Sequence, residues 1–140
     1  MQFDPENNIN KLCALGMQFE GEGKPEEADR VFQQAWNEAA NAIEKFTAAH
    51  YIARHQTSVA DKLKWDEIAL NFALSVDGNE IKSVYPSLYL NIAKCHEDMG
   101  DIGKAIENYQ LALNFTSFLP NDGYGKMIKA GVDNGIARVC

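Results

Sequence analysis

Apolar residues recur at every third or fourth position along almost the whole chain, with polar residues between them. This spacing is the period of an α-helix that packs along one face. Stretches in which apolar and polar residues alternate between hairpin turns do not occur, so the sequence predicts helices rather than strands. The helical period runs from about residue 8 to the end, and helix-breaking residues divide it into about seven helices. The breaks lie at Gly21–Pro25, Thr57–Asp61, Asp77–Asn79, Gly100 and Pro120–Gly123.

Several breaks carry residues that commonly begin a helix. Pro25 suits a first helical turn because it has no N–H group to leave unpaired. The boundary near Asn41 is open between one long helix and a bend, and Pro86 either begins a helix or bends one that starts near Ile81. Aspartate side chains accept hydrogen bonds from the unpaired N–H groups at a helix start. Three aspartates are therefore expected to be N-caps: Asp61, Asp101 and Asp122.

The chain resembles itself at a distance of 77 residues. The first copy of the pattern consists of Leu12, Leu15, Gly16, Phe19, Gly23, Ala28, Phe32 and Ala35, and the later copy consists of Tyr89, Ile92, Ala93, His96, Gly100, Ala105, Tyr109 and Ala112. A third copy lies between these two. There, Ile52, Ala53 and Gln56 match Ile92, Ala93 and His96 at a distance of 40 residues.

This repeated pattern resembles the tetratricopeptide repeat, a family of helix-turn-helix units of about 34 residues. In that family, large and small residues line the first helix, a turn with glycine follows, and alanine, an aromatic residue and alanine line the second helix. The resemblance implies an all-α superhelix, a right-handed solenoid of about three hairpins. We expect the hairpins at about residues 10–43, 44–79 and 84–119.

The segment from about residue 122 to 139 is expected to be a helix that caps the array. One stripe of this helix is apolar or small, which suits packing on the third hairpin. The stripe consists of Ile128, Gly131, Val132, Gly135, Ile136 and Val139. Four charged residues of the same helix are expected to face solvent: Lys126, Lys129, Asp133 and Arg138. Residues 1–140 are therefore predicted to form a single domain.

The charge of the chain disfavours binding to nucleic acid. It has 140 residues, with 13 Lys and Arg against 20 Asp and Glu, for a formal net charge of −7. Proteins that bind phosphate backbones draw affinity from clustered basic residues, which are absent here. No apolar run is long enough to cross a membrane, and the first residues do not resemble a secretion signal, so a cytoplasmic protein without membrane contact is expected.

No pattern of residues predicts a catalytic, metal or cofactor site. His50 and His55 are five residues apart, which places them on different faces of a helix and disfavours a shared metal ion. The three cysteines, Cys13, Cys95 and Cys140, form no C-x-x-C pair and are expected to be reduced thiols. Whether any of them senses oxidants stays open.

The family resemblance implies that certain first-helix positions face a concave groove, where such arrays hold peptides or partner helices. Arg54 and Lys94 would be neighbours there and, with Asn91, would form a cationic patch suited to a carboxylate. The alternative is that these charges are solvated and paired locally along their helices. The groove candidates are Met17, Glu20, His50, Arg54, Asn91 and Lys94.

We therefore expect a non-catalytic module that binds a peptide or a partner protein of unknown identity in its groove. Two alternatives remain open. One is a structural, self-assembling protein that forms a homodimer through an exposed apolar edge, and the other is an accessory subunit of an enzyme encoded elsewhere.

Overall fold

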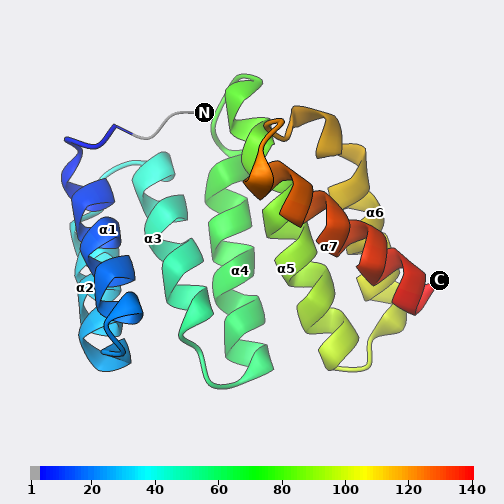
Figure 1. The fold of residues 1–140 in the computed structure, drawn as a ribbon, viewed down its shortest axis with the longest axis horizontal. Coiled ribbons are helices and arrows are strands. Elements are labelled where there is room, and N and C mark those ends of the chain that lie inside the picture. The colour runs from blue at the N-terminus through cyan, green and yellow to red at the C-terminus, as the bar shows by residue number, and fades with distance from the viewer. Residues whose placement is uncertain (1–3) are drawn as a thin grey trace. The chain divides into compact units, whose positions relative to one another are not determined.

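The computed structural model describes residues 4–140, and this part of the chain is helical without strands (Figure 1). The all-α, helical-repeat prediction is confirmed. Seven α-helices and two short 3-10 helices are present: α1 Asn8–Gly21, α2 Pro25–Glu38, α3 Ala42–Arg54, α4 Val59–Leu74, η1 Glu80–Val84, α5 Tyr85–Asp98, α6 Ile102–Asn114, η2 Thr116–Phe118 and α7 Gly123–Val139.

The chain divides into two compact units, Met1–Val76 and Asp77–Cys140. The first unit holds α1 to α4, and the second holds α5 to α7 with both 3-10 helices. The single domain over residues 1–140 stays a prediction. Within residues 4–140, no helix is long and apolar enough to span a bilayer.

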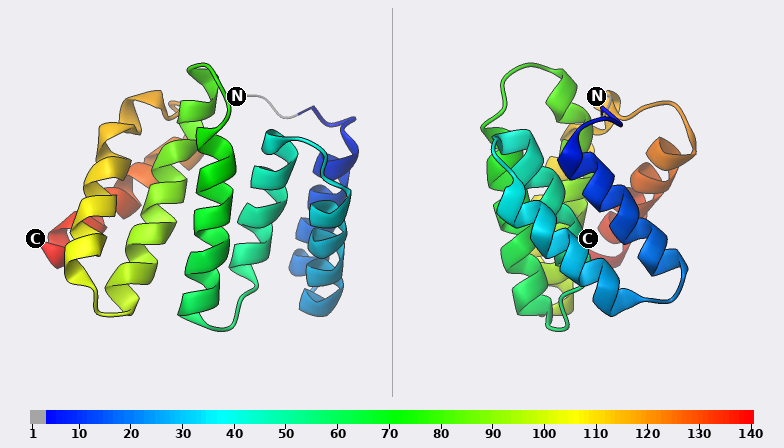
Figure 2. Two further views of the ribbon diagram at one scale, coloured as in Figure 1. Left: turned by 180° about the vertical axis from the view of Figure 1, so that it is seen from behind. Right: turned by 90° about the vertical axis from the view of Figure 1, so that its left-hand side faces the viewer.

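The first unit consists of two helical hairpins, α1–α2 and α3–α4 (Figure 2). Helix α3 packs on both α1 and α2. The Phe32 ring of α2 is fully buried in this core, against α1. A Cβ atom on Gly16 would lie 2.2 Å from that ring, so only glycine fits at this position. The predicted pairing of small and large side chains between helices therefore exists here.

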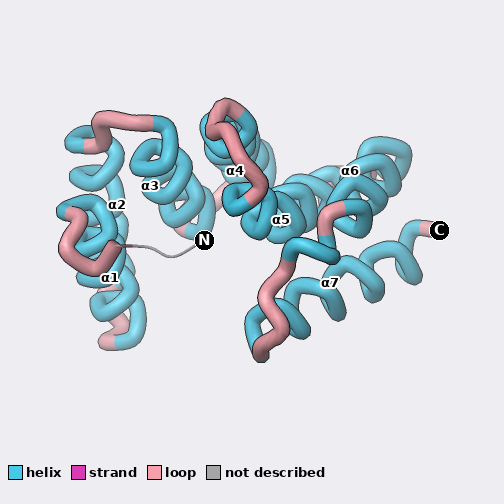
Figure 3. Tube along the Cα trace, turned by 90° about the horizontal axis from the view of Figure 1, so that it is seen from above, coloured by secondary structure: helices cyan, strands magenta, loops and turns pink. Residues whose placement is uncertain are grey.

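The second unit is built on the α5–α6 hairpin, and α7 packs on both of its helices (Figure 3). Its core includes Ala93, Ala105 and Tyr109, all fully buried. A Cβ atom on Gly135 would lie 2.2 Å from the Tyr109 ring, which is the counterpart of the Gly16–Phe32 contact. The predicted stripe of α7 faces this core, because Ile128, Val132 and Gly135 are buried.

Helix starts follow local capping chemistry, with one correction to the sequence prediction. Asp101 and Asp122 are N-caps, as predicted, and accept from the backbone N–H groups of Lys104 and Gly125. Asp61 is not an N-cap. The hydroxyl of Ser58 accepts from the Asp61 N–H at 3.0 Å instead, so α4 begins one turn earlier than predicted. A serine hydroxyl reaches the N–H three residues on as well as an aspartate does, and the sequence offered both.

The two boundaries left open by the sequence are both breaks. Helix α2 ends at Glu38, and the Asn41 side chain caps α3 by accepting from the Glu44 N–H at 2.9 Å. Pro86 lies in the first turn of α5, after the 3-10 helix η1. Proline is tolerated there because first-turn N–H groups have no partner within the helix.

Candidate binding surface

The first helices of the two hairpins in the first unit, α1 and α3, pack against each other and carry a connected cluster of side chains. We call this cluster the α1–α3 face. It consists of Met17, Glu20, Tyr51, Arg54 and His55. Three of its members, Met17, Glu20 and Arg54, are among the predicted groove candidates.

Contacts between α1 and α3 run along the whole cluster. The Tyr51 hydroxyl donates to Met17 Sδ at 3.4 Å. The Arg54 guanidinium lies over the Tyr51 ring, 5.3 Å from its centroid, and its Nη2 donates to Glu20 Oε1 at 3.1 Å. His55 Nε2 lies 2.7 Å from Glu20 Oε2. Because a carboxylate only accepts hydrogen bonds, His55 is the donor in this contact.

Exposure differs strongly between the charged members of the face. The Arg54 side chain is 45% exposed, the Glu20 side chain 22% and the His55 side chain 14%. Met17 is 43% exposed. The outermost groups are therefore a guanidinium and an apolar thioether, while the carboxylate and the imidazole lie deeper.

His50, another predicted groove residue, lies beside this face but adds no charge to it. Its ring is partly buried next to Phe46 and Tyr51. Burial lowers its pKa from 6.5 to about 4, and the positive charges of Arg54 and Lys62 act in the same direction. Its Nδ1 is buried, and no hydrogen-bond partner is present for it within residues 4–140. His50 is therefore neutral at pH 7.

Cys13 is also close to α3 but is chemically quiet. It is buried in the core between α1, α2 and α3, with 2% of its surface exposed. Burial raises the pKa of the thiol to about 12, so the thiolate that would react with oxidants is scarce at neutral pH.

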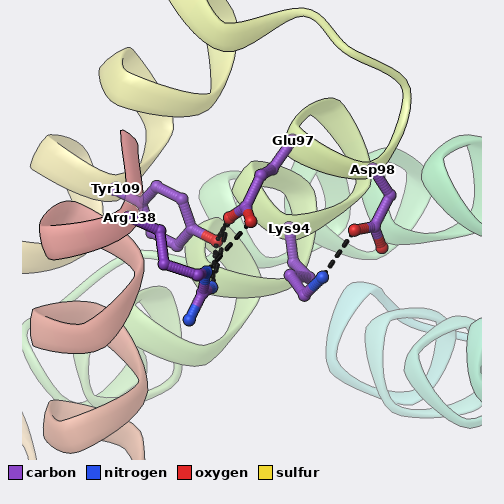
Figure 4. Close-up of polar contacts among 5 residues, drawn as sticks. All are labelled: Lys94, Glu97, Asp98, Tyr109 and Arg138. Carbon is purple, nitrogen blue, oxygen red and sulfur yellow. Dashed lines mark hydrogen bonds and ion pairs between the residues drawn. The ribbon is translucent and has the colours of Figure 1, made fainter. Parts of the chain in front are cut away.

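The two groove candidates of the second unit are less connected. Lys94 donates to Asp98 one turn further along α5 (Figure 4), and Asn91 is partly buried. Local pairing along a helix is the alternative that the sequence had left open for Lys94. Arg54 has a carboxylate partner as well, although that partner comes from another helix. The participation of all six candidates in binding stays a prediction.

The second unit also holds a three-residue polar cluster that the sequence did not predict (Figure 4). Arg138 of α7 donates from Nε to Glu97 Oε2 at 2.9 Å and from Nη2 to Glu97 Oε1 at 3.1 Å. The Tyr109 hydroxyl donates to Glu97 Oε1 at 2.7 Å and accepts from Arg138 Nη2 at 3.1 Å. We call this cluster the Glu97 lock. Arg138 was predicted to face solvent, and although its side chain is 46% exposed, its guanidinium joins α7 to α5.

The pKa values in the Glu97 lock follow from these contacts. Hydrogen bonds from Arg138 and Tyr109 lower the pKa of Glu97, and the same carboxylate raises the pKa of Arg138. The pKa of Tyr109 rises to about 12, first because the hydroxyl is buried and then because it donates to Glu97. Near neutral pH the lock is therefore an ion pair with a neutral phenol.

Glu20 and Glu97 occupy the same position of two repeats. They are 77 residues apart, which is the repeat distance found for the apolar positions. Each binds an arginine of the next first-type helix, Glu20 in α3 and Glu97 in α7. The signal was present in the sequence, but the comparison of repeats considered apolar and small residues and passed over the acidic pair.

The geometry of both units is that of a helical-repeat protein. The tetratricopeptide repeat family model matches residues 86–116, which cover nearly all of α5 and α6. The resemblance seen in the sequence is therefore confirmed over this hairpin, the third of the predicted units. No curated protein and no solved structure shows significant similarity to the chain.

Proposed function

We propose that this chain is a non-catalytic interaction module that binds a segment of a partner protein on its first-helix surfaces. The tetratricopeptide repeat over residues 86–116 supports this class of function. Arrays of such repeats are typically scaffolds for other proteins. The partner is a protein or peptide, and its identity is not encoded in any motif of the chain.

The α1–α3 face is the observation that supports the proposal most. It presents an exposed apolar side chain, Met17, and an exposed cation, Arg54, joined through Tyr51 on two packed helices. A surface that combines an aromatic ring, an arginine and an apolar side chain has the composition of a binding hot spot. Its residues are anchored on rigid helices, so a partner that binds there pays little to order the surface.

The test is quantitative capture of partner protein from native lysate by the purified full chain. The double variant Arg54→Gln and Lys94→Gln removes both predicted cations without creating a repulsion beside Glu20 or Asp98. The control is Lys64→Gln with Lys129→Gln, which removes the same charge from two exposed lysines on α4 and α7.

We expect the Arg54 and Lys94 variant to lose at least about fivefold of the captured partner, as removal of a contact worth about 1 kcal/mol would produce. The control variant is expected to retain capture. Equal capture by both variants would show that the partner binds elsewhere on the chain.

A further inference from the structure

Glu20 uses each of its two oxygens for a different side chain. Oε1 accepts from Arg54 and Oε2 accepts from His55. Of the two donors, Arg54 is the exposed one and His55 is the enclosed one, with 45% and 14% of their side chains exposed. A ligand that approaches the α1–α3 face therefore meets Arg54 first.

The equivalent carboxylate in the second unit is held differently. Glu97 forms two parallel hydrogen bonds with Arg138 and a third with the Tyr109 hydroxyl. Two-point arginine–carboxylate pairs are stronger and more specific in geometry than one-point pairs. The residue after Arg138 is Val139, whereas the residue after Arg54 is His55, so the two sites differ in their second donor.

These differences make the pair in the first unit exchangeable. If Glu20 releases Arg54, its carboxylate still has the hydrogen bond from His55 and remains partly solvated. Arg54 would then need a new anion, and its one-point contact with Glu20 is weak enough to be replaced. The apolar surface next to that anion site is Met17, whose sulfur contacts Tyr51.

We propose that Glu20 is an internal counter-ion of Arg54, which a carboxylate of the partner replaces while Glu20 stays bonded to His55. This inference rests on the proposed function and specifies its ligand chemistry. The partner segment carries a carboxylate on Arg54 and an apolar side chain on Met17 and Tyr51. Glu20 lowers the affinity for every such segment and thereby limits binding to segments that supply both groups.

The test uses the full chain labelled with nitrogen-15 and the probe N-acetyl-leucyl-aspartate. Its neutral counterpart, N-acetyl-leucyl-asparagine amide, has the same apolar group without the carboxylates. The readout is the Nε–Hε resonance of Arg54 during titration with each probe. The variants are Glu20→Gln, Glu20→Asp and the matched control Glu97→Gln, and their backbone spectra report whether the fold is retained.

We expect Glu20→Gln to raise the affinity for the acidic probe about fivefold, the effect of removing one competing surface ion pair. Glu20→Asp, whose shorter side chain reaches Arg54 less well, is expected to raise it in the same direction. Affinity for the neutral probe and affinity of the Glu97→Gln variant are expected to stay at their original values.

Two outcomes would overturn different parts of the proposal. If Arg54 responds to the acidic probe equally in the original chain and in both Glu20 variants, Glu20 is not a competitor, and the proposed binding surface survives. If Arg54 responds to neither probe in any variant, the α1–α3 face does not bind such segments, and the proposed function loses its main support.

Discussion

Two glycines in the chain lie under aromatic rings, and this contact decides what the neighbouring residues can do. Gly16 lies under Phe32 and Gly135 lies under Tyr109. In the first unit, the Phe32 ring also stacks on Tyr51 at 5.0 Å between centroids. In the second unit, the Tyr109 ring rests on Gly135, and its hydroxyl reaches Glu97. The aromatic position of the repeat therefore serves as packing alone in one unit and as packing with a polar contact in the other.

The variant Gly135→Ala is expected to lower the free energy of unfolding by about 1–3 kcal/mol, because the added methyl group would overlap the Tyr109 ring. Thermal or chemical unfolding measures this change. The matched control is Gly123→Ala, also in α7, where an added Cβ meets no atom within 4 Å. Equal stability of the two variants would contradict the packing role of Gly135.

His50 predicts a specific dependence of stability on pH. Its pKa is lowered from 6.5 to about 4 in the folded chain, so the unfolded chain binds a proton first as the pH falls. The free energy of unfolding should therefore be highest above pH 6.5 and decrease from there toward pH 4. Glu44 and Glu97, whose pKa values are lowered, add their own loss only below about 4.5.

The measurement is the unfolding free energy between pH 7 and pH 5 for the original chain and for His50→Leu, a residue that the third repeat carries as Leu90 at the same position. The variant is expected to show a flatter pH dependence in this interval. Identical slopes would mean that His50 titrates with an ordinary pKa.

At the scale of elements, α7 occupies the position of a first helix. It packs on α5 and α6, as α3 packs on α1 and α2, and it binds the repeat-equivalent glutamate through an arginine. Its outer side differs from α3, however. Five residues before Arg54 lies the fully buried Ala49, and five residues before Arg138 lies the exposed Asp133. A polar outer side is typical of the terminal helix of a repeat array, so the position and the surface of α7 agree with a cap.

The Glu97 lock is expected to hold α7 on the α5–α6 hairpin. The variant Arg138→Gln removes the ion pair and leaves Glu97 with the Tyr109 hydroxyl. We expect backbone amide exchange in α7 to become about tenfold faster, because local opening of the helix then costs less free energy. Hydrogen exchange measured by mass spectrometry follows this region directly.

Lys129→Gln is the control for the lock, because Lys129 is exposed on the same helix. It removes one positive charge from α7 and leaves the contacts of Arg138 in place. Unchanged exchange in the Arg138→Gln variant, or the same acceleration in both, would show that apolar packing alone holds α7.

At the scale of the whole molecule, most of the helical organisation could be predicted because it is local. The period of apolar residues, the glycine turns and the caps at Asp101 and Asp122 are each determined by a few neighbouring residues. The error at Asp61 arose where Ser58 and Asp61 compete to cap one helix, and only the path of the backbone decides between them.

The candidate site could be predicted only in part, for a physical reason. The repeat pattern placed Met17, Glu20 and Arg54 on first helices, and the structure brings these three residues together. Which carboxylate pairs with which cation depends on the packing of separate helices. The 34-residue separation of Glu20 and Arg54 and the 41-residue separation of Glu97 and Arg138 are not set by the period of one helix.

The central claim is that the first-helix surface of the first unit contacts a partner protein, and site-specific photo-crosslinking tests it most directly. The photoreactive residue p-benzoylphenylalanine is placed at position 17 on the α1–α3 face or, as a control, at position 27 on the exposed side of α2. After irradiation in native lysate, the account predicts a discrete crosslinked partner from position 17 and not from position 27. Crosslinking only from position 27, or to the same extent from both positions, would contradict it.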